Sequence, residues 1–136
     1  MKKILFIHPK FPESFWTLQD ACDLNGRLAL VPPVSLATIA ALTPSHYEMK
    51  IVDECVEPID FEQTCDIVAI TGYTVHEPRM IEIAKAFKKR GKLVVAGGPF
   101  CSSHVTEAVN YFDVVFVGES ERIWPQFLEE WEQNAH

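Results

Sequence analysis

Glycines and hydroxyl-bearing residues follow three of the apolar runs in this 136-residue chain. The first segment is Thr71-Gly72-Tyr73-Thr74-Val75, the second is Gly97-Gly98-Pro99-Phe100, and the third is Gly118-Glu119. Hydroxyl groups and free backbone N–H groups can hydrogen-bond a ligand, and glycine lets a bulky ligand approach the main chain closely. We expect these residues to line a groove that holds a large, uncharged or singly charged ligand.

The segment after the first apolar run excludes several common ligand sites. It reads His8-Pro9-Lys10-Phe11-Pro12, whereas a dinucleotide site needs the pattern G-x-G-x-x-G in this place. Binding of NAD or FAD in the usual mode is therefore not expected, and the P-loop pattern is absent as well. A phospho-accepting receiver domain needs acidic residues where this chain has His8 and Thr71.

The cysteines predict no metal site. Cys22, Cys55, Cys65 and Cys101 form no C-x-x-C pair and have no spacing typical of a zinc knuckle or an iron–sulfur cluster. We expect reduced thiols, most of them packed as small apolar groups.

Composition and charge favour a single globular domain over residues 1–136, because 48% of the residues are hydrophobic and 23% are charged. A net charge of -7 disfavours nucleic acid or an anionic membrane surface as the main partner. The apolar run after Lys3 ends at His8 and is too short for a signal peptide. No run approaches the roughly 20 residues that cross a bilayer. We expect a soluble, cytoplasmic protein without a membrane span.

Unbroken apolar runs alternate with helical stripes along the chain. Such runs predict strands that are buried on both faces of a parallel sheet. The predicted strands cover 3–8, 47–52, 66–71, a central strand from Leu93 to the Gly97-Gly98 turn, and 114–117. The predicted helices cover 34 to about 42, 78 to about 90, 102 or 103 to about 111, and a stretch after Gly118.

This alternation predicts an α/β fold, a flavodoxin- or Rossmann-like three-layer sandwich with a five-stranded parallel sheet. Ligands of such folds bind beyond the carboxyl ends of the strands. Residues 9–33 are rich in proline, and we expect a long loop with its own short helix over that edge.

Four short motifs carry a resemblance to a known family. They are Pro32-Pro33-Val34-Ser35-Leu36, Thr71-Gly72-Tyr73 in place of a Ser-x-Leu motif, Gly97-Gly98, and Gly118-Glu119-Ser120-Glu121. In this order, and over nearly the whole chain, they resemble the cobalamin (B12)-binding domain found at the N-terminus of B12-dependent radical SAM enzymes.

The resemblance implies a corrinoid ligand whose dimethylbenzimidazole tail lies between the sheet and the last helices, with the corrin ring over the strand ends. The tail would lie along the residues of the three turn segments, from Thr71 to Val75, from Gly97 to Phe100, and at Gly118 and Glu119. The loop over 9–33 would lie near the ring, which His76 or His104 could also contact. The family's axial-histidine motif Asp-x-His-x-x-Gly does not occur in this chain.

The resemblance further implies that residues 1–136 are one domain of a larger radical SAM protein such as a methyltransferase. The cluster motif Cys-x-x-x-Cys-x-x-Cys does not occur in this sequence. The [4Fe-4S] cluster, S-adenosylmethionine and bond-making chemistry are therefore expected in a separate catalytic domain, which would be a partner of this one.

Two other functions remain open at this stage. A flavodoxin-like domain could bind FMN or a small phosphorylated ligand at the turn over 71–74, through N–H groups at a helix start. Alternatively, a domain that has lost its ligand could serve as an interaction surface, with Phe15, Trp16 and Trp124 as exposed aromatic residues.

Overall fold

The computed structural model describes residues 1–14, 19–27 and 33–135. The aromatic residues Phe15 and Trp16, and Pro32 of the first motif, lie outside the described residues.

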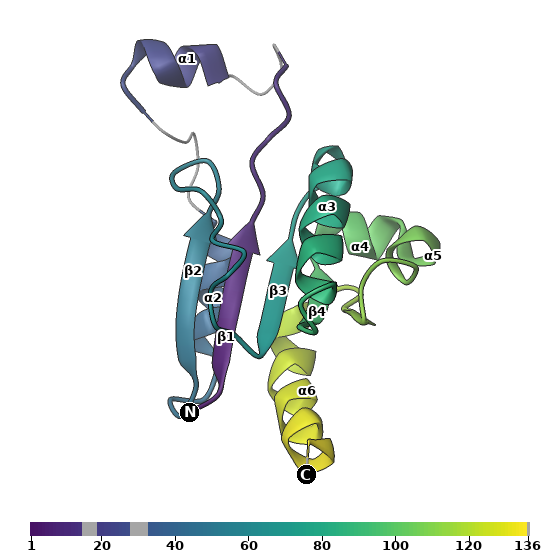
Figure 1. Cartoon of the computed structure of the whole chain (residues 1–136). Coiled ribbons are helices and arrows are strands. Elements are labelled where there is room, and N and C mark those ends of the chain that lie inside the picture. The colour runs from purple at the N-terminus through teal and green to yellow at the C-terminus, as the bar shows by residue number, and fades with distance from the viewer. Residues whose placement is uncertain (15–18, 28–32, 136) are drawn as a thin grey trace.

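A parallel sheet forms the centre of the molecule, with the strand order β2-β1-β3-β4-β5 (Figure 1). Every neighbouring pair of strands is parallel. The predicted five-stranded α/β fold is confirmed, and β3 rather than β4 has the middle position, with β4 between β3 and β5. The strands are β1 (Lys3–His8), β2 (Glu48–Asp53), β3 (Ile67–Thr71), β4 (Leu93–Gly97) and β5 (Val114–Val115).

The last strand is shorter than the predicted range of 114–117. Val114 pairs with Val95 and Val115 with Ala96. The next partner would be Gly97, where β4 ends, because Gly98 has a φ of 91° and leaves the strand direction. The ladder therefore stops after two residues.

Helices cover both faces of the sheet and give three layers (Figure 1). Short helix α1 lies beyond the carboxyl ends of β1 and β2, where the loop over 9–33 was expected. The helical segments are α1 (Gln19–Leu24), α2 (Val34–Ala41), the 3-10 turn η2 (Thr74–His76), α3 (Glu77–Lys88), α4 (Pro99–Ser103), α5 (Val105–Ala108) and α6 (Ser120–Asn134).

The helix expected to start at Ser102 or Ser103 starts earlier and is divided in two. It begins at Pro99, because proline has its φ preset for the first helical position and lacks the N–H group that would be unpaired there. His104, with a φ of -130°, separates α4 from α5.

Each face of the sheet has its own apolar core. Leu5 and Ile7 of β1 pack with Met80 and Phe87 of α3 on one face. Ile4 and Phe6 of the same strand belong to the other core, with Leu36 of α2 and Trp124 and Leu128 of α6. Because consecutive strand residues point to opposite faces, coverage of both faces explains the unbroken apolar runs. In the described part of the chain, no helix is long and apolar enough to cross a membrane.

The turn after β4 packs tightly against the end of β3. A Cβ atom added to Gly98 would lie 2.4 Å from Oγ1 of Thr71 and 3.3 Å from the backbone N and O of Gly72. The backbone of Gly98, at φ 91° and ψ -175°, is in a region that only glycine enters readily. Gly98 therefore permits a contact within the protein that no other residue allows.

We predict that Gly98→Ala lowers the free energy of unfolding by about 3 kcal/mol, through backbone strain and the clash with Thr71. Gly91→Ala is the matched control, because Gly91 also has a positive φ of 72° but has no atom within 4 Å of the added Cβ. The control should lose only about 1 kcal/mol in urea unfolding. Equal losses in the two variants would contradict the proposed close contact.

Candidate functional site

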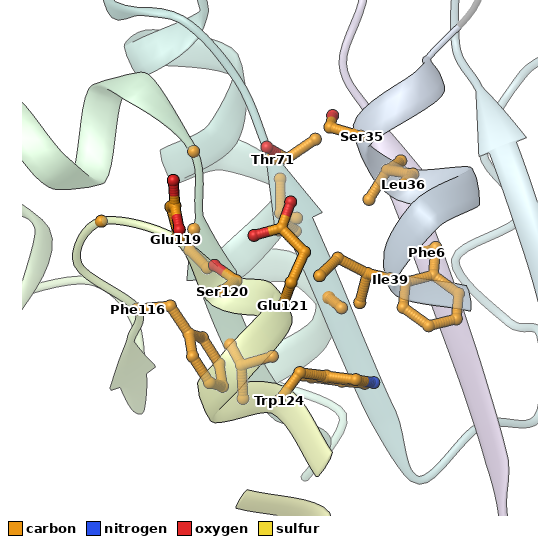
Figure 2. Close-up of a pocket in the computed structure, with 17 residues that line it drawn as sticks. Phe6, Ser35, Leu36, Ile39, Thr71, Phe116, Glu119, Ser120, Glu121 and Trp124 are labelled. Carbon is orange, nitrogen blue, oxygen red and sulfur yellow. The ribbon is translucent and has the colours of Figure 1, made fainter. Parts of the chain in front are cut away.

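A slot of about 230 Å³ lies between α2 and α6, over the carboxyl half of the sheet (Figure 2). It is on the face of the sheet opposite α3. The residues that line it are Phe6, Ser35, Leu36, Ile39, Ala69, Ile70, Thr71, Val95, Ala96, Gly97, Gly98, Phe116, Gly118, Glu119, Ser120, Glu121 and Trp124.

The floor of the slot exists because small residues stand on the strands there. Ala69 pairs with Phe6 on one side and Val95 on the other, so these three side chains form one row across the sheet. Gly97 ends β4, and a Cβ atom there would lie 3.2 Å from Oγ of Ser120 and 3.4 Å from Cβ of Phe116. Larger side chains at positions 69 and 97 would fill the space that the slot occupies.

The ring of Trp124 closes the inner end of the slot, and a buried hydrogen bond holds it in place. Nε1 of Trp124, on α6, donates to Oγ1 of Thr43 at 2.9 Å. The Thr43 hydroxyl in turn donates to the carbonyl oxygen of Ile39, at 3.0 Å. Thr43 follows α2, so this chain of hydrogen bonds joins α2 to α6, and the Trp124 ring lines the slot with its polar atom already satisfied.

The mouth of the slot is polar. Figure 2 shows Ser35 and Thr71 on one side of the opening, with Glu119, Ser120 and Glu121 from the start of α6 facing them. The first turns of α2 and α6 both lie at this end (Figure 2). The slot can therefore hold a flat apolar group inside and hydrogen-bond polar groups at its mouth.

The slot brings together only part of the predicted binding set. Thr71, Gly97, Gly98, Gly118 and Glu119 line it. The remaining predicted residues do not line it; they are Gly72, Tyr73, Thr74, Val75, Pro99 and Phe100.

These remaining residues occupy two other environments. Phe100 is fully buried in the core on the α3 face, and Gly72 is packed so closely that an added Cβ would lie 2.8 Å from Sδ of Met80. Tyr73, Thr74, Val75 and Pro99 are exposed. They lie next to the strand ends in sequence and are placed to meet a ligand only outside the slot.

Sequence reasoning missed the floor and the walls. Ala69, Val95 and Phe116 belong to predicted strands, and nothing in an unbroken apolar run shows which of its residues face a cavity. Trp124 follows Gly118 in a predicted helix, and the helical pattern does not show that its ring lines a slot. Ser35, Leu36, Ser120 and Glu121 did stand in the motifs that carry the family resemblance, and that was the available signal.

A second group of polar side chains, His8 and His76, lies at the carboxyl end of β1. Nδ1 of His76 accepts a hydrogen bond from the backbone N of Tyr73 at 2.9 Å, so the ring proton of the neutral histidine is on Nε2. This buried Nε2 has no hydrogen-bond partner in the described part of the chain. The ring of Phe11 covers His76, with centroids 4.4 Å apart, and His8 lies 5.1 Å away.

Burial keeps these two histidines neutral. Burial, with a smaller contribution from the neighbouring His8, lowers the pKa of His76 to about 4. Burial also lowers the pKa of His8, against the opposing effect of the Asp53 carboxylate. Among the described residues, no three His, Cys, Asp or Glu side chains come together as a metal site.

Glu54 fixes the start of the loop that covers His76. Its carboxylate accepts hydrogen bonds from the backbone N of Lys10 and from Nε of Arg79, each at 3.0 Å. Burial tends to raise the pKa of Glu54, but these hydrogen bonds outweigh it and the pKa is lowered. Lys10 and the adjacent Phe11 are therefore held against the sheet by a charged group.

His104 occupies a different position. Its ring stacks on Phe100 with centroids 5.5 Å apart, and its Nδ1 is 2.8 Å from Oγ of Ser103. It does not line the slot.

We predict that Thr43→Val lowers the free energy of unfolding by about 1–3 kcal/mol, because the buried N–H of Trp124 loses its acceptor. Thr38→Val is the matched control. Thr38 makes the same kind of bond, from Oγ1 to the carbonyl oxygen of Val34 at 3.0 Å, but it is exposed and does not contact Trp124. The control should change stability by less than about 0.5 kcal/mol in chemical unfolding. A similar loss in both variants would be evidence against the closing role of this bond.

We predict that His76 makes stability fall as the pH is lowered from 6.5 towards 4. In that window the unfolded chain protonates this histidine and the folded chain does not, which costs about 3 kcal/mol at the lower limit. In His76→Asn, the amide oxygen can still accept the Tyr73 N–H but does not titrate. Unfolding curves from pH 4 to 7.5 should show a weaker pH dependence for the variant. Parallel curves for the two proteins would rule out this role of His76.

Comparison with known proteins relates the chain to methyltransferases. No family model matches it. It is 36% identical over 130 residues to an uncharacterized methyltransferase of Synechocystis sp., a match that covers 93% of this chain and 24% of that protein. It is 36% identical over 98 residues to the bacteriochlorophyllide d C-8(2)-methyltransferase of Chlorobaculum tepidum, covering 71% of this chain and 22% of that protein.

A third relative is the hopanoid C-2 methylase of Rhodopseudomonas palustris, 29% identical over 121 residues, with 87% of this chain and 23% of that protein covered. Among solved structures, the N-terminal domain of hypothetical protein TM0182 of Thermotoga maritima matches with a TM-score of 0.45 and 23% identity, over 85% of this chain and 82% of that one. The chain thus spans about a quarter of the length of these curated relatives, and it is homologous to one segment of proteins named methyltransferases or methylases.

Proposed function

We propose that this chain is a cobalamin-binding module, which holds and orients a corrinoid for a radical SAM methyltransferase domain. The observation that carries the proposal is the slot between α2 and α6, which is apolar inside, polar at its mouth and open at the carboxyl edge of the sheet. The methyltransferase names of the relatives support the same function, because corrinoids are methyl carriers.

The residues of the slot fit the tail of a corrinoid. An apolar protein cavity of about 150 Å³ is known to take up benzene, so the larger slot here has room for a bicyclic aromatic base. The hydroxyl groups of Ser35, Thr71 and Ser120 stand where the ribose and phosphate of the tail would leave the slot. The carboxylates of Glu119 and Glu121 can accept hydrogen bonds from the carboxamide groups at the rim of a corrin ring.

In this proposal the residues of the chain bind and orient, and make no bonds themselves. When bound, cobalamin supplies a cobalt centre that can carry a methyl group. Trp124, Phe116 and Leu36 exclude water from the tail, and Gly98 keeps the turn after β4 close to Thr71, so that the mouth has a fixed shape.

The bond-making steps belong to another domain in this proposal. The sequence has no Cys-x-x-x-Cys-x-x-Cys motif to hold a [4Fe-4S] cluster for S-adenosylmethionine, and the relatives are about four times as long as the matched segment. We place the complete enzyme in the cytoplasm as part of the same proposal.

The two alternative functions have less support. An FMN phosphate at the turn over 71–74 would need free N–H groups, but the N–H of Tyr73 is already bonded to His76. The expectation that Trp124 is an exposed interaction residue is wrong, because only 2% of it is exposed.

We predict that the purified protein retains hydroxocobalamin after desalting, as measured by corrin absorbance. Ser35→Trp should weaken binding at least about tenfold, since a large ring at the mouth of the slot costs more than about 1.4 kcal/mol of binding free energy. Ser35 is exposed in the first turn of α2, so this change leaves the core intact.

Ala37→Trp is the control, because Ala37 is exposed on the same helix and does not line the slot. It should bind like the wild type. Absence of retained corrin in the wild type would contradict the proposed function, and unchanged binding by Ser35→Trp would show that the slot is not the site.

A further inference from the structure

We infer that the slot selects corrinoids whose tail ends in an apolar aromatic base, such as dimethylbenzimidazole, and discriminates against a tail that ends in adenine. The inference rests on the proposed function and concerns the chemistry of the same slot.

The side chains of the slot change from polar to apolar with depth. Thr71 and Gly97 form a paired row at the ends of β3 and β4, and Ser120 lies against Gly97. The next row on the same face is Ala69 with Val95, two residues deeper, or about 7 Å at roughly 3.3 Å per residue. A bicyclic base that fills this depth lies against apolar side chains and the backbone of the two strands.

The described lining offers no free polar group at that depth. The side-chain oxygens of the lining belong to Ser35, Thr71, Glu119, Ser120 and Glu121, which Figure 2 shows around the mouth. Nε1 of Trp124 is the polar atom of the inner wall, and it is bonded to Thr43.

The backbone of the floor is also occupied. The carbonyl oxygen of Ala96 accepts from the N–H of Phe116 at 2.8 Å, and β3 and β4 are paired along their length. A base that enters therefore finds no backbone partner there.

An apolar lining favours dimethylbenzimidazole over adenine. Dimethylbenzimidazole presents methyl groups and ring carbons, which gain from leaving water. Adenine carries an exocyclic amine and ring nitrogens, which would lose their hydrogen bonds to water without replacement. Burial of unpaired polar groups of this kind reduces affinity by about ten- to hundredfold.

The test compares three corrinoids on the wild-type protein by equilibrium dialysis. They are cyanocobalamin, its analogue with adenine as the tail base, and dicyanocobinamide, which has no tail. Cyanocobalamin should bind about ten- to hundredfold more tightly than the adenine analogue, and cobinamide should bind more weakly than cyanocobalamin because it leaves the slot unfilled.

Two neighbouring valines supply matched variants. Val95→Thr adds a hydroxyl group to the floor of the slot, whereas Val94→Thr adds one to the core on the opposite face. The ratio of the affinities for cyanocobalamin and the adenine analogue should decrease in Val95→Thr and remain unchanged in Val94→Thr. The wild-type comparison does not depend on the folding of either variant.

The outcomes separate the inference from the proposed function. Equal affinity for the two tailed corrinoids, tighter binding of the adenine analogue, or cobinamide binding as tight as cyanocobalamin would overturn the inference while corrinoid binding itself stood. A preference that narrows equally in both valine variants would overturn it too. If none of the three corrinoids bound, this result would contradict both the proposed function and the inference.

Discussion

The hydrogen bond from Trp124 to Thr43 sets the shape of the face on which the slot lies. It ties the segment after α2 to α6, and both partners are buried, so breaking it would leave a donor without water or protein. The two helices are joined at this inner end, while their first turns stand apart at the carboxyl edge of the sheet (Figure 2). The slot is therefore closed at the inner end, where this hydrogen bond and the shared apolar core hold the two helices together, and open at the mouth.

The opening is kept by small residues where a parallel sheet normally carries large ones. Ala69 and Gly97 leave room above β3 and β4, and Gly98 lets the following turn pack on Thr71 instead of crossing the mouth. The carboxylates of Glu119, the N-cap residue of α6, and of Glu121, in its first turn, suit the positive end of the helix dipole. They also make the mouth a place for hydrogen-bond donors, which agrees with a ligand rich in amide groups.

Much of the fold could be predicted because each strand is buried on both faces. Continuous apolar runs marked β1 and β3 to within one residue, and the stripe from Met80 to Phe87 marked α3. The sequence does not predict the start of α4, because the apolar run continues through Pro99 and that proline looks like part of a turn.

The sequence predicts only part of the slot. Its mouth carries glycines and hydroxyl groups, whereas Ala69 and Val95 look like any other core residues. Packing decides which face of the strands lies under α2 and α6. An apolar run without alternation does not indicate which of its residues point to that face.

Two consecutive residues, Thr71 at the end of β3 and Gly72 directly after it, face the two polar environments at the carboxyl edge of the sheet. Thr71 faces the slot and Gly98, whereas Gly72 faces Met80 and His76 on the other side. At neutral pH, His76 presents a protonated Nε2 and an Nδ1 already bonded to Tyr73, so neither ring nitrogen has a lone pair free for a metal ion. In the proposed complex, affinity would then depend on the fit of the tail in the slot rather than on a bond from His76 to the metal. The chemistry of the slot floor would therefore decide which corrinoids the protein accepts.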